Sequence, residues 1–231
     1  MTQPTPADIW VIIPAYNEEK VIRQTLEEVL AHPFQVVVID DCSTDQTAAA
    51  AKDLPIHFLQ HPINMGQGAA LQTGNTYAQA QGAQWVVHFD ADGQHRVADI
   101  LPMVAPLWAG EADITLGSRF LAGGSGEAMP ALRKAVLKLG RIFHGLLTGL
   151  WLTDAHNGYR ALNAKALATI HITQNGMAHN SEIIQETARH QLRYKEVPVV
   201  IRYSDYSLAK GQSIWNAANI VGDLLVKRLF Q

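Results

Sequence analysis

The sequence predicts an α/β protein in which helices cover both faces of a mainly parallel central sheet. Between residues 9 and 117, five short apolar runs alternate with segments whose apolar residues recur at helical spacing. The runs are continuously apolar, as in strands buried on both faces, and strand–helix alternation is typical of parallel sheets. No long-period repeat or low-complexity linker divides the sequence, so we treat residues 1–231 as one domain.

The first half of the chain supplies most of the expected elements. The expected strands are residues 9–13, 36–39, 56–59, 85–89 and 114–117. The expected helices are residues 18–31, an alanine-rich segment capped by Ser43 or Thr44, a segment opened by Gly66 and Gly68, and residues 97–108. Glycines at a helix start can let it approach an anion, although such turns are also common without one.

The pattern changes after Ser118. The expected elements are a glycine-rich loop over 121–129, a leucine-rich helix over 133–151, a polar loop over 154–160, a helix capped by Asn180 or Ser181, and a strand over 197–203. Polar and apolar residues occupy opposite helical faces of residues 214–230. This spacing predicts a C-terminal amphipathic helix.

Charge is divided unevenly between the two halves. Residues 1–118 carry 4 Lys or Arg and 14 Asp or Glu, whereas residues 119–231 carry 14 and 7. An acidic first half suits a metal site, and a basic second half suits phosphate groups or an anionic membrane surface. The alternative is that the halves neutralise each other across an internal contact.

Cysteine usage and hydropathy bear on the compartment. Cys42 is the only cysteine, so an intramolecular disulfide is excluded and the chain fits the reducing cytoplasm. Asp8 interrupts the short N-terminal apolar run, and no Lys or Arg precedes it, so we expect no signal peptide. No stretch approaches the ~18–20 apolar residues of a transmembrane helix. We expect peripheral membrane contact through residues 133–151 or 214–230, with packing against the sheet as the alternative.

Two carboxylates directly follow the expected strand 85–89. Asp90 and Asp92 lie one residue apart in WVVHFDADGQH. Ligands of open α/β sheets bind at the C-terminal tips of strands. Neighbouring carboxylates repel each other and are costly to desolvate unless a cation lies between them. Because Mg²⁺ and Mn²⁺ prefer oxygen ligands and leave positions for phosphate oxygens, the pair predicts a divalent-metal site, against the plainer alternative of a solvated acidic turn.

Six different sequence motifs are spread over nearly the whole chain. They are VIIPAYNEE, VVVIDDCSTDQT, NMGQGAALQTG, FDADGQH, GSR at 117–119 and DAHNGYRAL at 154–162. Together they resemble the family 2 glycosyltransferases, and within them the dolichol- and polyprenol-phosphate sugar synthases. The resemblance implies a GT-A type fold, with residues 1–118 binding the nucleotide sugar and residues 119–231 binding the acceptor.

The resemblance also implies roles for the matching residues. The donor-binding positions are Pro14, Tyr16, Glu18, Ile39, Asp41, Asp90, Ala91, Arg119, Arg202 and Lys210. The metal positions are Asp90, Asp92 and Gln94, with Mg²⁺ or Mn²⁺ as the cofactor. Arg133 corresponds to a position that holds the acceptor phosphate, and Asp92, Arg119 and Asp154 are the catalytic candidates.

The implied reaction moves a hexosyl group from a GDP- or UDP-hexose to a polyprenyl phosphate at the cytoplasmic face of a membrane, with no nucleic-acid partner. Breaking the sugar–diphosphate bond builds negative charge on the departing phosphate, which a metal and arginines stabilise. A hydroxyl acceptor needs a general base, whereas a phosphate acceptor arrives ionised. The basic second half of the chain therefore favours the phosphate acceptor.

Alternatives remain open at this point. The chain could extend a saccharide in cell-surface polysaccharide synthesis, with Asp154 or Glu182 as the base, or it could be a non-catalytic nucleotide-sugar-binding module. A sugar nucleotidyltransferase is disfavoured, because PAYNEE stands where a Gly-rich, basic loop is expected. His95 either supports the metal loop or packs, and Glu182 either favours a helix dipole or acts as a base.

Overall fold

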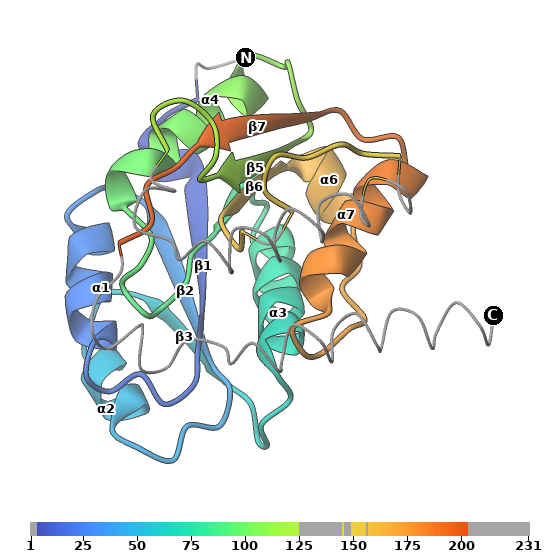
Figure 1. The fold of residues 1–231 in the computed structure, drawn as a ribbon. Coiled ribbons are helices and arrows are strands. Elements are labelled where there is room, and N and C mark those ends of the chain that lie inside the picture. The colour runs from blue at the N-terminus through green and yellow to red at the C-terminus, as the bar shows by residue number, and fades with distance from the viewer. Residues whose placement is uncertain (1–3, 125–144, 146–148, 156, 203–231) are drawn as a thin grey trace, which may run out of the picture.

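The computed structural model describes residues 4–124, 145, 149–155 and 157–202. Its centre is a seven-stranded sheet of order β3-β2-β1-β4-β6-β5-β7 (Figure 1). The strands are β1 (Ile9–Ala15), β2 (Gln35–Asp40), β3 (His57–Gln60), β4 (Trp85–His88), β5 (Ile114–Ser118), β6 (Arg160–Asn163) and β7 (Tyr194–Pro198). All neighbouring pairs are parallel except those that β6 makes with β4 and β5. The predicted, mainly parallel α/β fold is confirmed.

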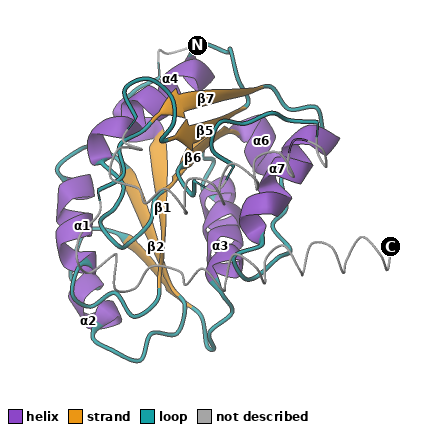
Figure 2. Ribbon diagram, viewed as in Figure 1, coloured by secondary structure: helices purple, strands orange, loops and turns teal. Residues whose placement is uncertain are grey.

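Helices cover both faces of this sheet (Figure 2). The helices α1 (Ile22–Leu30), α2 (Thr47–Ala51) and α4 (Ile100–Trp108) contribute to the core on one face, and α3 (Gln67–Ala80), α6 (Ala164–Thr169) and α7 (His179–Arg189) to the core on the other. Two short 3-10 helices, η1 (Pro6–Asp8) and η2 (Val97–Asp99), precede β1 and α4. In β1, Val11 faces the first core and Ile12 the second, which explains why this strand is apolar throughout.

Helix α3 packs closely on β1 and β2 because its middle residue is a glycine. A Cβ atom at Gly74 would lie 2.4 Å from Ile12 Cγ2 and 2.8 Å from Ile39 Cδ1. A side chain here would push the helix off the sheet. The close packing helps to set how the first turn of α3, which contains Gln67, meets the edge of the sheet.

The antiparallel strand β6 was not predicted from the sequence. It begins at Arg160, which was expected in a polar loop but is buried and pairs with His88 of β4 and Leu116 of β5. A charged residue that opens a four-residue run gives little periodic signal. Pairing with a strand on each side is what makes this short segment a strand.

Several expected boundaries were wrong. The alanine-rich helix starts at Thr47 rather than behind a Ser43 or Thr44 cap, and the Ser43 hydroxyl instead accepts a hydrogen bond from Asn17 N–H at 2.9 Å. Helix α7 begins at His179, and β7 covers residues 194–198 rather than 197–203. The expected helix over 133–151 lies largely outside the described residues, and the C-terminal helix over 214–230 lies wholly outside them.

A buried carboxylate ties the second half of the sheet together. Asp113, which precedes β5, accepts hydrogen bonds from Arg193 Nη2 at 2.8 Å, Lys165 Nζ at 3.1 Å and Asn163 Nδ2 at 3.2 Å. Asp113 is 1% exposed, whereas Arg193 and Lys165 reach it from the surface. The hydrogen bonds from Arg193 hold the pKa of Asp113 well below its usual range.

We predict that Asp113→Asn lowers the free energy of unfolding by about 1–3 kcal/mol at neutral pH, the usual cost of losing hydrogen bonds to a charged group. A depressed carboxyl pKa stabilises the fold above the unfolded pKa of about 4, and this contribution disappears as the pH falls toward the folded pKa. Urea titrations between pH 7 and pH 3 measure it. Asp53→Asn, at an exposed ion pair with Arg23, serves as the control. A stability difference that persists unchanged at low pH would contradict the assignment.

Candidate active site

The polar tips of several strands meet at one edge of the sheet. Strands β2, β1 and β4 are parallel neighbours, so Asp41, Glu18 and Asp90, which follow them, gather at their C-terminal ends. Strand β5 has the same direction as β4, since β6 runs antiparallel to both, and its tip carries Arg119 at this edge. The expected clustering of strand tips is therefore confirmed.

Asp90 is held by neighbours from three segments. Gln67 Nε2 donates to its Oδ1 at 3.0 Å, and His95 Nε2 lies 3.5 Å from its Oδ2. Gly158 passes so close that a Cβ atom there would lie 3.2 Å from Oδ2. A side chain at position 158 would press on the Asp90 carboxylate, and the glycine there leaves room for it.

The loop after Asp90 is fixed by hydrogen bonds between its backbone and side chains. Thr25 Oγ1 donates to the carbonyl of Ala91 at 3.1 Å, and Gln94 N–H donates to Asp92 Oδ1 at 3.0 Å. Burial raises the pKa of both Asp90 and Asp92 above the usual aspartate range, and the charge of Asp90 raises the pKa of Asp92 further. The charge of Asp90 thus disfavours ionisation of Asp92, and the charge of Glu18 acts in the same sense on both.

His95 supports this loop as a neutral ring. Its Nδ1 accepts a hydrogen bond from Asp90 N–H at 3.1 Å, which leaves the proton of the neutral ring on Nε2, toward the Asp90 carboxylate. Its ring stacks on Tyr159 with centroids 4.4 Å apart, and burial lowers the pKa of His95 to about 4. His95 thus packs on Tyr159 and also supports the Asp90 loop through a hydrogen bond, so the two expected roles are combined.

The donor atoms at the loop fit a hard divalent cation. Asp90, Asp92 and Gln94 all offer side-chain oxygens, the ligands that Mg²⁺ and Mn²⁺ prefer. Within the described ranges, no three His, Cys, Asp or Glu side chains form a metal site by themselves. A cation here would complete its coordination with water or substrate oxygens, as Mg²⁺ commonly does with phosphates.

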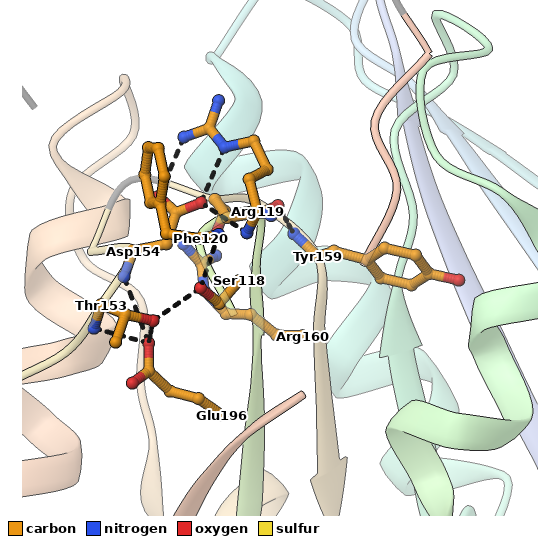
Figure 3. Close-up of polar contacts among 9 residues, drawn as sticks. Ser118, Arg119, Phe120, Thr153, Asp154, Tyr159, Arg160 and Glu196 are labelled. Atoms are coloured by element: carbon orange, nitrogen blue, oxygen red, sulfur yellow. Dashed lines mark hydrogen bonds and ion pairs between the residues drawn. The ribbon is translucent and has the colours of Figure 1, made fainter. Parts of the chain in front are cut away.

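Arg119 and Asp154 form a buried, bidentate ion pair (Figure 3). Arg119 Nε donates to Asp154 Oδ2 at 2.7 Å and Nη2 donates to Oδ1 at 2.9 Å. The backbone N–H of Arg119 also donates to Oδ2, at 3.2 Å. Both oxygens of Asp154 are thus committed to one arginine, which is the arrangement of a carboxylate that orients a guanidinium.

Asp41, expected to bind the base or ribose, organises a loop of its own chain. Its Oδ1 accepts from Met65 N–H at 2.8 Å and contacts His61 Nδ1 at 2.7 Å, while Oδ2 accepts from Gly66 N–H at 2.6 Å. The space beside Gly66 is filled by the Asn175 carbonyl, 2.4 Å from where a Cβ would lie. This turn is therefore packed against protein, and a nucleotide role for Asp41 stays a prediction.

The other donor positions differ in accessibility. Tyr16 is exposed and Glu18 is buried just after β1, where the charge of Glu18 contributes to the raised pKa of Asp90. Pro14 and Ile39 are register partners in the sheet, and the Ile39 side chain is fully buried beneath α3. The Ile39 side chain is therefore part of the core, and the donor role expected for this position stays a prediction.

The predicted phosphate-binding cations are only partly described. Arg202 N–H donates to the Gln94 carbonyl at 2.9 Å, which brings its backbone beside the Asp92 loop, and its guanidinium pairs with Glu28 at 3.1 Å on the surface. Arg133 and Lys210 lie outside the described residues, so their roles stay predictions.

Glu182, the other candidate base, is engaged in shaping a loop. Its Oε2 accepts from the backbone N–H groups of Thr173 and Gln174, both at 2.9 Å, and its Oε1 accepts from the Thr173 hydroxyl. The carboxylate near the start of α7 thus holds the preceding loop against the helix.

Arg160 is a buried cation that sequence analysis did not single out. It lies behind the acidic edge, and its Nη2 donates to the Asn157 carbonyl at 3.1 Å and to Asn180 Oδ1. Burial lowers the pKa of Arg160 to about 10, and the charges of Asp90 and Asp154 oppose that shift. The guanidinium therefore stays charged at neutral pH. In the sequence, the one feature that could have indicated a role for Arg160 is its place shortly after the Asn157-Gly158 pair.

We predict that Asp92→Asn raises the melting temperature of the metal-free protein at pH 7. A carboxyl whose pKa is raised by folding is ionised at pH 7 at a cost to the fold, and asparagine keeps the oxygen that accepts from Gln94 while removing the charge. Mn²⁺ should raise the melting temperature of the wild type but not of Asp92→Asn. Thermal melts in EDTA and in MnCl₂ measure both effects, with Asp53→Asn as the control. Equal responses to Mn²⁺ in wild type and Asp92→Asn would exclude a metal at this carboxylate.

None of the described helices is long and apolar enough to cross a membrane.

Known proteins resemble this chain over most of its length. The chain is 31% identical over 242 residues to the UDP-N-acetylglucosamine–dolichyl-phosphate N-acetylglucosaminyltransferase of Methanococcus voltae, covering 96% of both chains. It is 30% identical to the undecaprenyl-phosphate mannosyltransferase of Micrococcus luteus, covering 94% of this chain and 91% of that one. The structure of Mycobacterium tuberculosis glucosyl-3-phosphoglycerate synthase with Mn²⁺ and UDP-glucose superposes with a TM-score of 0.71 at 18% identity, covering 96% of this chain and 77% of that one.

That structural likeness confirms the GT-A type fold. The model of glycosyl transferase family 2 matches residues 10–170, which include the three strand tips and the Arg119–Asp154 pair. The chain belongs to glycosyl transferase family 2.

Proposed function

We propose that this glycosyltransferase moves a hexosyl group from a nucleotide-diphospho-sugar, a GDP- or UDP-hexose, to a polyprenyl phosphate. The observation that carries the proposal is the pairing of two charge sets at one sheet edge, carboxylates at Asp90 and Asp92 and a fixed guanidinium at Arg119. The first set suits a metal-bound diphosphate and the second suits the phosphate oxygens themselves. Relatives named for dolichyl- and undecaprenyl-phosphate acceptors support this choice.

On the donor side, we assign Asp90, Asp92 and Gln94 to a divalent cation, Mg²⁺ or Mn²⁺. When bound, this cation supplies charge stabilisation for the departing diphosphate. Pro14, Tyr16, Glu18 and Asp41 would line the nucleoside, with Ala91 behind the diphosphate. Support comes from their common edge of the sheet and from the related fold that binds Mn²⁺ with UDP-glucose.

Arg119 would contact the departing phosphate from the same edge of the sheet that carries Asp90 and Asp92. Negative charge grows on that phosphate as the sugar leaves. A hydrogen-bond donor that needs no reorientation stabilises this charge most. Asp154 supplies the orientation by binding both Nε and Nη2 of Arg119. Asp154 is therefore assigned as a positioning residue rather than as a base.

The acceptor assignment rests on what the two candidate bases are doing. A saccharide hydroxyl would need a base with a free carboxylate oxygen. Asp154 holds Arg119 with both oxygens, and Glu182 holds the loop at Thr173 and Gln174. A polyprenyl phosphate needs no base, only cations, and we assign Arg133 to that purpose. Arg202 and Lys210 are assigned to the phosphates of the sugar donor. The lipid would be met at the cytoplasmic face of the membrane by peripheral contact.

A transfer assay tests this function. Purified protein is given polyprenyl phosphate and a panel of labelled GDP- and UDP-hexoses, and label is counted in the lipid phase. We expect label from at least one donor, loss in EDTA, recovery with Mg²⁺ or Mn²⁺, and no turnover by the nearly isosteric Asp92→Asn. Undiminished transfer in EDTA would show that the reaction needs no metal. Label found only in water-soluble saccharides would show that the acceptor is not the lipid.

Arg133 separates the two acceptors. Arginine binds phosphate with two parallel donors, which lysine cannot copy. Arg133→Lys should therefore lower turnover with polyprenyl phosphate, Arg133→Ala should lower it further, and calorimetry should give both variants a nearly unchanged affinity for the donor nucleotide. If Arg133→Ala is fully active and free saccharides are the better acceptors, the acceptor is a hydroxyl.

A further inference from the structure

Glu196, in the edge strand β7, gathers three hydrogen bonds on a single carboxylate oxygen. Its Oε1 accepts from Thr153 N–H at 2.7 Å, from the Thr153 hydroxyl at 2.7 Å and from Asp154 N–H at 3.1 Å (Figure 3). The residues it holds are the start of the loop that carries Asp154. Glu196 thus fixes the backbone from which the Arg119-binding carboxylate projects.

The same oxygen also terminates a chain of hydroxyl groups. Because the Thr153 hydroxyl donates to Glu196, the 2.6 Å contact between the two hydroxyls assigns Ser118 Oγ as donor to Thr153 Oγ1. Ser118 Oγ in turn accepts from Phe120 N–H at 3.2 Å. Chains of hydrogen bonds that end on an ionised group polarise and strengthen one another.

Arg119 lies between the two arms of this network. One arm fixes its chain neighbours, Ser118 and Phe120, and the other fixes Asp154, which binds its guanidinium. Both arms end on Glu196 Oε1, so the position of the guanidinium depends on a carboxylate that does not touch it. In the β5–β7 ladder, Glu196 is the register partner of Leu116, two residues before Ser118.

We propose that Glu196 is a positioning residue of the sugar-transfer site, acting on Arg119 through Thr153 and Asp154. The inference rests on the proposed role of Arg119 at the departing phosphate. A misplaced guanidinium stabilises the developing charge less, so loss of Glu196 lowers kcat more than it raises KM for the donor.

Two matched pairs of variants test the network. Glu196→Gln keeps an acceptor oxygen in place and Glu196→Ala removes it; Thr153→Ser keeps the hydroxyl and Thr153→Val removes it at nearly constant shape. We expect Glu196→Ala and Thr153→Val to lower kcat by about 10- to 100-fold, with Glu196→Gln and Thr153→Ser closer to wild type. In an Arg119→Ala background, Glu196→Ala should have little further effect, because both changes remove the same interaction.

A control and an activity-independent readout complete the design. Lys195, which neighbours Glu196 in β7, makes an exposed ion pair with Glu111. Glu111→Ala breaks this pair and should leave kcat unchanged. The Arg119 Nε–H, which donates to Asp154, should exchange slowly in nitrogen-15 NMR spectra of the wild type and faster in Glu196→Ala, whatever the acceptor proves to be. Unchanged exchange in Glu196→Ala, or an equal loss of kcat in the Arg119→Ala background, would overturn the inference. Absence of transfer to polyprenyl phosphate would instead count against the proposed function alone.

Discussion

Mutual repulsion between carboxylates at one edge of the sheet is the constraint around which the site is built. Asp90 and Asp92 follow a buried parallel strand, and Glu18 follows its neighbour, so the topology itself brings the three charges together. The fold tolerates them through Gln67, the backbone at Gln94 and the buried charge of Arg160. Like charges that are held close together at a cost to stability are typical of cation-binding sites.

The positive charge of Arg119 at the same edge is also held in a fixed position. Arg119 is locked by Asp154 and, through Thr153, by a carboxylate on the last strand of the sheet. A preformed guanidinium loses little entropy when a phosphate oxygen arrives, which is the condition for effective electrostatic catalysis. Both oxygens of Asp154 bind Arg119, which is the basis for proposing that Asp154 is not a base and that the acceptor arrives already ionised.

The sequence predicts the parallel part of the fold well because buried strands and amphipathic helices carry periodic signals. The tips at Asp90 and Asp41 could also be located, since apolar runs end there. Strand β6 and Arg160 could not be predicted, because a buried cation with polar neighbours resembles a loop until its pairing with β4 is known. The roles of Asp154 and Glu182 depend on distant partners in the chain, which no local pattern reveals. The burial of the Ile39 side chain beneath α3 likewise depends on a distant part of the chain.

The central proposal is that a divalent cation held by Asp90 and Asp92 and the guanidinium of Arg119 act on one diphosphate. Anomalous diffraction from crystals grown with Mn²⁺ and the nucleoside diphosphate of the preferred donor tests it most directly. We predict a manganese peak bound to the carboxylates of Asp90 and Asp92 and to the diphosphate, with the guanidinium of Arg119 hydrogen-bonded to phosphate oxygens and still paired with Asp154. A manganese peak away from both aspartates, or a diphosphate out of reach of Arg119, would contradict it.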